Sequence, residues 1–225
     1  MKKRLSLTER IVKWLGLPVD ELEYDLIYGS RRVVKNKFME DPKQKDHFFG
    51  YDLWEKVKDE VKDKIPKGYT LYGEFLGYDH NGGVVQKGYD YGCEEGEHKL
   101  EVYRITQTSP EGLVTELSYP EMEEFCERYK LNLTTLMYYG RADNWLEVFS
   151  EDLTVPFKDN FIKTLEKEYN EKDCFMCNNK VPEEGVVVRK ESLFSFEAYK
   201  LKSFRFLEWE TKQLDSGESD VESDN

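Results

Sequence analysis

Apolar and polar positions follow two different periods along this chain. A helical period of three to four residues predicts helices over 5–15, 51–64, 120–130 and 159–169. A strict alternation predicts strands over 69–78, 84–91, 99–106, 185–190 and 196–206. The turn Asn81-Gly82-Gly83 predicts that the first two of these strands form a hairpin. Together these segments predict an α+β domain in which helices flank antiparallel sheets.

Helix boundaries have their own signals. Pro120 is expected in the first turn of the third helix, and Asp159 is expected to cap the fourth. An earlier apolar stretch, Leu26 to Val34, predicts a further strand that carries a basic pair, Arg31-Arg32.

The size and charge of the chain narrow its class. With 225 residues, 39% of them hydrophobic, it is long enough for one domain with a proper core. The sequence has neither a membrane-length apolar run nor a signal peptide, which predicts a cytoplasmic protein without membrane partners. A net charge of −13 argues against nonspecific binding of nucleic acid, so any basic surface must be local. Residues 213–225 are expected to form a disordered acidic tail.

Two cysteines stand at a spacing that zinc sites use. Cys174 and Cys177 are half of such a site, but no second pair follows, and the other candidates (Cys93, His98, Cys126) are scattered. We therefore interpret Cys174 and Cys177 as two reduced thiols in a turn.

The strongest chemical signal is a pair of lysines in an aromatic strand. Lys200 and Lys202 are two residues apart, so both side chains point to the same face of the strand. Two neighbouring ammonium groups repel each other unless a polyanion lies above them, and a nucleotide phosphate would fill that role. Glu184 precedes the neighbouring strand and is expected to approach the same place. The alternative is that both lysines lie on the solvent face of an edge strand.

A carboxylate in another apolar strand points to the same kind of site. Glu74 shares a strand face with Thr70, Tyr72 and Leu76, and burial of its charge is costly unless it meets a cation, a metal or a sugar hydroxyl. A structural ion pair with a neighbouring basic residue is the alternative interpretation.

Five short strings occur in one order along the chain. They are Ser30-Arg31-Arg32, Gly73-Glu74-Phe75, the strand from Lys99 to Ile105, Glu184-Gly185-Val186-Val187 and Lys200-Leu201-Lys202. In this order the chain resembles the covalent nucleotidyltransferases, and among them the phage-type ATP-dependent RNA ligases, over roughly residues 26–212. The resemblance implies the nucleotidyltransferase (ligase adenylation-domain) fold. It also implies ATP and magnesium as cofactors, and RNA ends with a 5′-phosphate and a 3′-hydroxyl as partners.

The resemblance assigns roles to single residues. Lys200 and Lys202 would contact the α-phosphate, and Glu184 would help to hold magnesium. Glu74 would bind the ribose hydroxyls, and Arg31 would contact the nucleotide or the RNA 5′-phosphate. Leu100 stands where relatives place the aromatic residue that stacks on adenine, a role that Tyr103 could take over.

One element of the family pattern is missing. No Lys-x-Asp-Gly string, which holds the family's nucleophilic lysine, occurs in the sequence, and the nearest string is Lys13-Trp14-Leu15-Gly16. Lys13 lies on the polar flank of a predicted helix, where an exposed amine is a poor nucleophile. We therefore expect an N-terminally incomplete ligase, a fragment or half of a split gene, in which residues 1–25 are an insertion and a companion chain could supply the lysine.

Two other functions remain open at this stage. The chain could be a non-catalytic remnant, or a split-ligase subunit, that binds nucleotide or RNA ends. A DNA ligase or capping-type enzyme on the same scaffold is disfavoured, because no further domain is expected after residue 206.

Overall fold

The computed structural model describes residues 3–21, 24, 26–30, 34–35, 53–193 and 195–215, and it confirms the α+β prediction. The helices are α1 (Leu7–Trp14), α2 (Leu53–Val61), α3 (Tyr119–Tyr129), α4 (Ala142–Phe149), α5 (Phe157–Tyr169) and α6 (Phe204–Asp215), with a short 3₁₀ helix at Lys62–Lys64. The strands are β1 (Tyr28–Gly29), β2 (Val34–Lys35), β3 (Tyr69–Gly77), β4 (His98–Thr108), β5 (Val114–Glu116), β6 (Asn132–Leu133), β7 (Gly185–Glu191) and β8 (Phe196–Lys202).

The central sheet is built on the long antiparallel pair β3–β4. β5 continues the sheet beyond β4 in antiparallel order, and β6 pairs with β4 in parallel. The register of β3 and β4 shifts by one residue between Tyr72 and Gly73, because Tyr72 lies opposite Arg104 whereas Gly73 lies opposite Val102. Tyr103 is therefore the extra residue of a β-bulge, and the alternation of side chains along β4 changes phase there.

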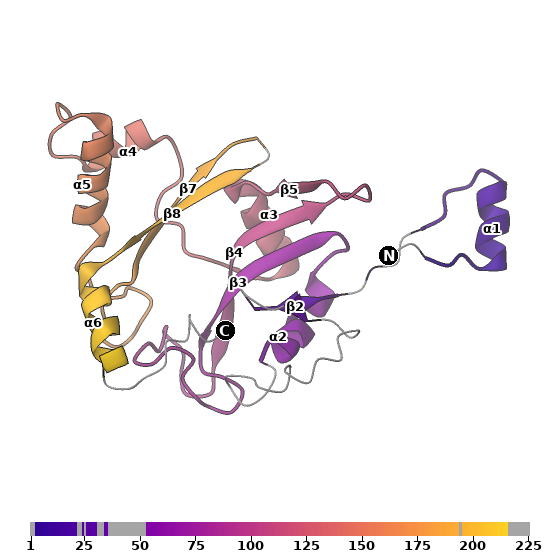
Figure 1. Cartoon of the computed structure of the whole chain (residues 1–225), viewed down its shortest axis with the longest axis horizontal. Helices are drawn as coiled ribbons and strands as arrows, with labels where there is room; N and C mark the ends of the chain where they lie inside the picture. The colour runs from indigo at the N-terminus through magenta and orange to yellow at the C-terminus, as the bar shows by residue number, and fades with distance from the viewer. Residues whose placement is uncertain are drawn as a thin grey trace.

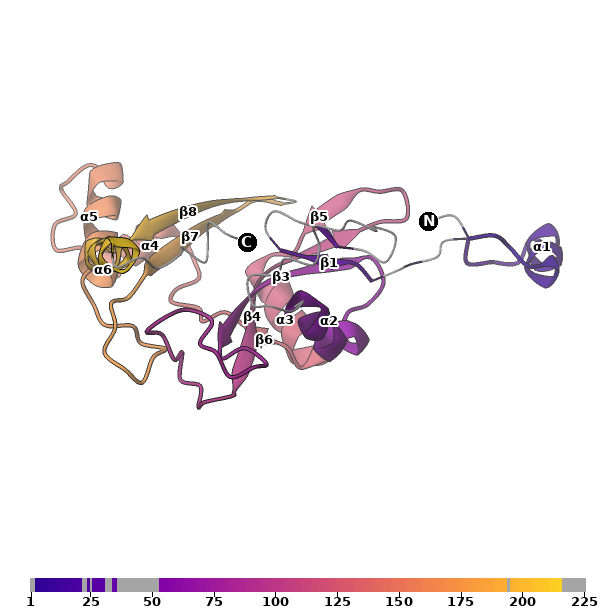
Figure 2. The same cartoon turned by 60° about the horizontal axis from the view of Figure 1, so that its bottom comes forward.

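One face of this sheet packs against helices. Val102 and Ile105 are fully buried against Met122 and Phe125 of α3. Further along the same face, Phe75 and Leu100 meet α2 in a second cluster. Figures 1 and 2 show α2 and α3 on this side of β3 and β4. Because successive residues of a strand point to opposite faces, Tyr72, Glu74 and Leu76 point to the other side.

The second sheet is the antiparallel hairpin β7–β8, which has its own core. Val186, Val188 and Leu201 pack against Trp145 of α4 and Leu165 of α5. In Figure 1 these helices and α6 lie at the outer side of the hairpin, and the β3–β4 sheet lies at its inner side. One face of the hairpin thus packs against α4 and α5, and Lys200 and Lys202 lie on the opposite face.

The strand expected at 84–91 does not form. After the predicted turn, whose Gly82 N–H donates to the Asp79 carbonyl at 3.0 Å, only an isolated bridge joins Tyr78 to Val84. The chain then turns repeatedly, and Tyr89 and Tyr91 become buried with Leu76 in a loop cluster. Tyr89 and Tyr91 pack against α6 and the segment before β7 and are not part of a sheet. The strand that pairs with β3 is therefore β4.

Several boundaries also differ from the prediction. α4 was not predicted, and the strand expected over 196–206 ends at Lys202, where α6 begins after Ser203. α6 extends to Asp215, past the expected start of the tail at 213, and residues beyond 215 lie outside the described part. α5 begins at Phe157, so Asp159 lies in its first turn and is not its cap.

Helix α1 lies apart from the β3–β4 sheet and the β7–β8 hairpin, whereas Asp20, which follows it, pairs with Lys67 at 3.6 Å. Both views show α1 well away from the two sheets. The amine of Lys13 pairs with the Glu21 carboxylate at 2.7 Å, and the Lys13 side chain is half-exposed. Lys13 therefore lies far from Lys200 and Lys202. No helix among the described residues has the length and apolar character to cross a membrane.

Candidate functional site

The two lysines occupy one face of β8, as the alternation predicted. In the β7–β8 register Lys200 lies opposite Val187 and Lys202 lies opposite Gly185. The amine of Lys200 forms a short ion pair with the carboxylate of Glu184, which directly precedes β7. Glu184 is also held through its backbone, because its carbonyl accepts a hydrogen bond of 2.9 Å from the Ser203 N–H. The structure thus brings Lys200, Lys202 and Glu184 together.

Lys202 has a partner that the sequence did not indicate. Its amine lies 3.6 Å from a carboxylate oxygen of Glu210 on α6 and 5.3 Å from the centre of the Phe206 ring. The side chains of Lys202 and Glu210 are both about three-quarters buried. This ion pair fixes the position of the amine beside the apolar core around Phe206.

Glu74 lies on β3 next to a second carboxylate. In the β3–β4 register Glu74 is directly opposite Glu101, so the two side chains share one face of the sheet. Burial raises the pKa of Glu101, and the amine of Lys99, 3.8 Å away, opposes that effect. Like charges opposite each other are unfavourable, so this pair favours binding of a cation or of hydroxyl donors.

The buried phenol of Tyr91 is influenced by the charges of both carboxylates of the predicted site. Burial raises the pKa of Tyr91, and the charges of Glu184 and Glu74 both raise it further. The Tyr91 hydroxyl donates a short hydrogen bond to Gln86, and the neighbouring Tyr89 hydroxyl donates to the Pro182 carbonyl at 2.7 Å. The loop between β3 and β4 therefore connects the Glu74 strand to the segment that carries Glu184.

At the far end of the hairpin, stacked cations join the two sheets. The ring of Phe196, which shares its strand face with Lys200 and Lys202, lies between the guanidinium groups of Arg189 and Arg104 at 4.2 and 5.2 Å. Arg104 also covers the Tyr72 ring at 4.3 Å. The lysine face of the hairpin and the Glu74 face of the sheet are therefore turned toward each other.

Two further residues predicted to contact the nucleotide, Leu100 and Tyr103, can be located in the structure. Leu100 lies opposite Phe75 and packs against α2, on the face of the sheet away from Glu74. Tyr103 is the bulged residue and is 46% exposed. Arg31 lies outside the described residues. The aromatic residue on the Glu74 face is Tyr72, which sequence reasoning had placed there without giving it a role.

The two cysteines lie in a turn and are packed differently. Cys174 is buried in the cluster with Tyr89 and Phe206, and burial raises the pKa of its thiol. Its backbone N–H donates to the Val181 carbonyl at 2.8 Å. Cys177 is partly buried against the same cluster. The two residues thus lie in a turn, as interpreted from the sequence, and the absence of zinc there stays a prediction.

The site has a mixed chemistry. The two ammonium groups can bind an anion by exchanging their carboxylate partners, whereas the opposed carboxylates Glu74 and Glu101 can bind a cation or hydroxyl groups. The Arg104 guanidinium is already paired with the Glu116 carboxylate on β5. Glu101, Arg104 and Glu210 were missed. Glu101 could have been found from the strand alternation, because it lies opposite Glu74 when β3 and β4 are aligned in their register. The β-bulge at Tyr103 changes the face on which Arg104 lies, so alternation along the strand does not predict its position. Glu210 lies on α6, a helix that was not predicted.

Comparison with known proteins gives one result for most of the chain. The family model described as RNA ligase matches residues 21–205. That range includes the β3–β4 sheet, the β7–β8 hairpin and every residue of the site except Glu210. No curated protein matches the chain.

Proposed function

This chain belongs to the RNA ligase family, and on that premise we propose that it seals RNA ends through an ATP-derived, adenylylated 5′ end. The observation that carries the proposal is the grouping of Lys200, Lys202 and Glu184 on a hairpin whose lysine face is turned toward Glu74. Basic groups on one side and carboxylates on the other suit a nucleotide, which offers phosphates at one end and ribose hydroxyls beside them. The fold proposed for this arrangement is the nucleotidyltransferase fold.

The lysines supply positive charge at the reacting phosphate. When a 3′-hydroxyl attacks the phosphorus of an adenylylated 5′ end, negative charge grows on the phosphate oxygens and AMP leaves. Lys200 and Lys202 point from one strand face and would donate to those oxygens, and Glu184 would exchange its contact with Lys200 as the phosphate binds. Because Lys202 is held by Glu210 and Phe206, its amine is positioned before the substrate arrives.

The carboxylates fit magnesium and ribose. Mg²⁺ prefers carboxylate oxygen ligands, and Glu184 offers one beside the lysines. Bound there, the ion would supply charge neutralisation at the phosphate. Glu74 accepts hydrogen bonds from the ribose hydroxyls in this proposal, and the charge of Glu101 opposite it strengthens the acceptor character of the pair. Tyr72, whose ring lies under Arg104, would contact the base from the same face.

The test compares two RNA substrates. In magnesium buffer without ATP, the purified chain is mixed with an acceptor RNA and a donor RNA that is already adenylylated at its 5′ end, and sealing is followed on a denaturing gel. A parallel reaction contains 5′-phosphorylated donor and ATP. We expect sealing of the adenylylated donor alone, because the sequence contains no Lys-x-Asp-Gly string. Intact-protein mass spectrometry should accordingly show no lysine–AMP adduct.

The outcomes separate the alternatives. If circular dichroism shows a folded protein that binds AMP and leaves the adenylylated donor untouched, the sealing proposal is wrong and the chain is a binding protein. Faster sealing of an adenylylated DNA donor than of the RNA donor would contradict RNA as the substrate. A one-to-one AMP adduct would show that a lysine of this chain, Lys13 included, acts as the nucleophile.

A further inference from the structure

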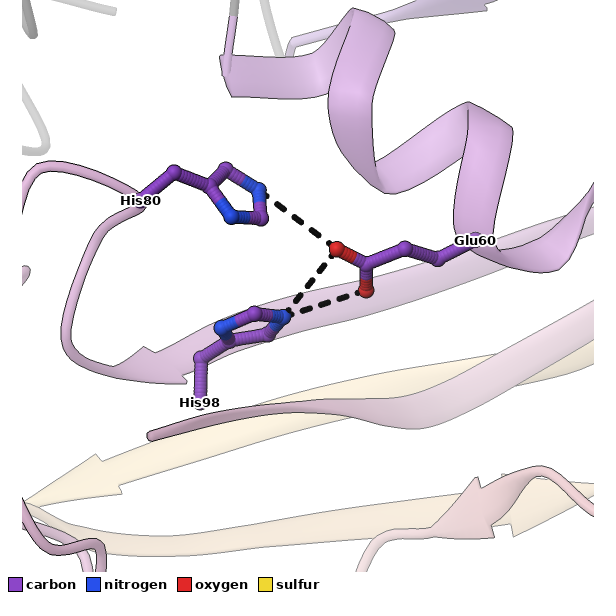
Figure 3. A group of neighbouring side chains, drawn as sticks. All are labelled: Glu60, His80 and His98. Atoms are coloured by element: carbon purple, nitrogen blue, oxygen red, sulfur yellow. Dashed lines mark hydrogen bonds and ion pairs between the residues drawn. The ribbon is translucent and has the colours of Figure 1, made fainter. Parts of the chain in front are cut away.

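Two histidines and a glutamate from three different elements meet at one end of the β3–β4 pair. His98 is the first residue of β4 and lies opposite Gly77, the last residue of β3. His80 follows in the turn after β3, and Glu60 comes from the last turn of α2. Figure 3 shows both imidazole rings directed toward the Glu60 carboxylate. None of these residues takes part in the proposed ligase site.

The distances between their ligand atoms are short. The Nε2 atom of His98 lies 3.1 Å from each carboxylate oxygen of Glu60, and the Nε2 atom of His80 lies 3.5 Å from one of them. One ligand atom from each of the three residues fits within a span of 4.8 Å. A tetrahedral zinc ion with bonds of about 2.0–2.1 Å separates its ligands by about 3.4 Å. Small side-chain rotations would therefore bring all three donors into range.

The surroundings hold the rings in place. The His98 ring stacks on Phe75, a core residue, with 4.8 Å between the ring centres, and it meets the His80 ring edge-on at 4.7 Å. The side chains of His80 and His98 are only 13% and 23% exposed, whereas that of Glu60 is 45% exposed. The two nitrogen donors are thus fixed by packing, and the carboxylate leaves a path for an ion from solvent.

The donor set distinguishes between metals. Two imidazole nitrogens and one carboxylate oxygen suit zinc and similar divalent transition ions, whereas magnesium and calcium prefer sites made of oxygen alone. With three protein ligands, a fourth tetrahedral position stays open for water. Among the described residues this is the one group of three or more histidine, cysteine or acidic side chains with such spacing.

We propose that Glu60, His80 and His98 form a binding site for a divalent transition metal ion of the zinc class. The bound ion ties α2 to the end of the β3–β4 pair and to the loop that begins at Tyr78. That loop carries Tyr89 and Tyr91, which pack against the segment of Glu184. The ion would thus add a link between α2 and the end of the β3–β4 pair, beside the apolar cluster that Phe75 and Leu100 form with α2.

Zinc binding to the whole chain tests this proposal directly. The protein is freed of metal with a chelator and titrated with ZnCl₂ by calorimetry, and its thermal unfolding is followed with and without zinc. We expect one zinc per chain, and a rise in the unfolding midpoint of roughly 5–10 °C at 100-fold excess over the dissociation constant. Adding chelator should reverse the rise.

Two variants locate the ion, and two others serve as controls. His98→Ala and Glu60→Gln should each weaken zinc binding at least ~10-fold, which at the same zinc concentration lowers the midpoint shift to about half or less. Glu60→Gln changes an exposed side chain and should fold normally. The matched control is His47→Ala, which removes the one remaining histidine of the chain, a residue outside the described part, and should leave binding unchanged. A variant with Cys174→Ser should also bind zinc as the wild type does.

X-ray absorption at the zinc edge separates this site from a cysteine site. The expected spectrum has nitrogen and oxygen neighbours at about 2.0–2.1 Å and lacks a sulfur shell at about 2.3 Å. A sulfur shell, or zinc binding that survives His98→Ala and is lost in Cys174→Ser, would overturn the proposal. A chain that binds no zinc, while remaining folded by circular dichroism, would overturn it equally.

Discussion

Replacing Gly185 with alanine should disturb the geometry of the lysine site without removing any charged group. Gly185 has a φ of +137°, a conformation that L side chains rarely adopt, and it lies opposite Lys202 in the hairpin. A Cβ atom added here would lie 1.9 Å from the Leu201 carbonyl oxygen and 3.0 Å from the Lys202 Cα. Both contacts are with backbone, so no side-chain rotation relieves them.

The expected cost follows from these distances. Ordinary contact begins at 3.4 Å, so the two strands would have to separate locally by more than 1 Å. Crowding of this kind costs about 1–3 kcal/mol, and the unfavourable φ adds about 1–2 kcal/mol. The free energy of unfolding should therefore fall by about 2–5 kcal/mol. For a chain of this length that corresponds to a lower unfolding midpoint by roughly 4–20 °C.

The matched control isolates the clash from the backbone strain. Gly112 also has a positive φ, +91°, but an added Cβ would meet nothing within 4 Å. Urea unfolding and thermal circular dichroism should show a loss of about 1–2 kcal/mol for Gly112→Ala, and a clearly larger loss for Gly185→Ala. Equal losses in the two variants would refute the argument that close approach of β7 and β8 requires a glycine.

Two further predictions concern buried ionisable groups. Burial raises the pKa of Glu101, so its ionisation destabilises the fold as the pH rises above about 4.5. Glu101→Gln should therefore raise the free energy of urea unfolding at pH 7, with a smaller gain at pH 4. A less stable variant at pH 7 would contradict the effect of burial. Burial also raises the pKa of Cys174, so at pH 8 its thiol should react with iodoacetamide more slowly than free cysteine does. Cys174→Ser should fold without needing zinc. Rapid labelling of Cys174 in the folded chain would contradict its burial.

Side-chain alternation was enough to predict the faces of the two strands that carry the site. Lys200 and Lys202 share one face of β8, and Glu74 lies on the face of β3 opposite Phe75. These predictions held because both strands are regular over the relevant residues. The approach of Glu184 to the lysines from a neighbouring strand was also expected, whereas its ion pair with Lys200 was not predicted.

Other features depend on contacts between distant segments. The bulge at Tyr103 shifts β4 by one residue, so simple alternation gives no correct face for Arg104. Residues 84–91 alternate like a strand, yet Tyr89 and Tyr91 are buried against Phe206 and its neighbours, which are more than a hundred residues away in sequence. The metal cluster has the same character, because Glu60, His80 and His98 come from three separate elements.

The central claim is that Lys200 and Lys202 act on the reacting phosphate, and the direct test is the sealing rate of three lysine variants on adenylylated RNA. Lys190 is the matched control, because it lies in the same hairpin and pairs with Glu197 at 3.3 Å. Its side chain points to the same face of β7 as those of Val186 and Val188, which is the face turned away from Glu74. We predict that Lys200→Ala and Lys202→Ala each lower the rate by ~10²-fold, whereas Lys190→Ala leaves it within about twofold. Folded variants of Lys200 and Lys202 that seal as fast as Lys190→Ala would contradict the account.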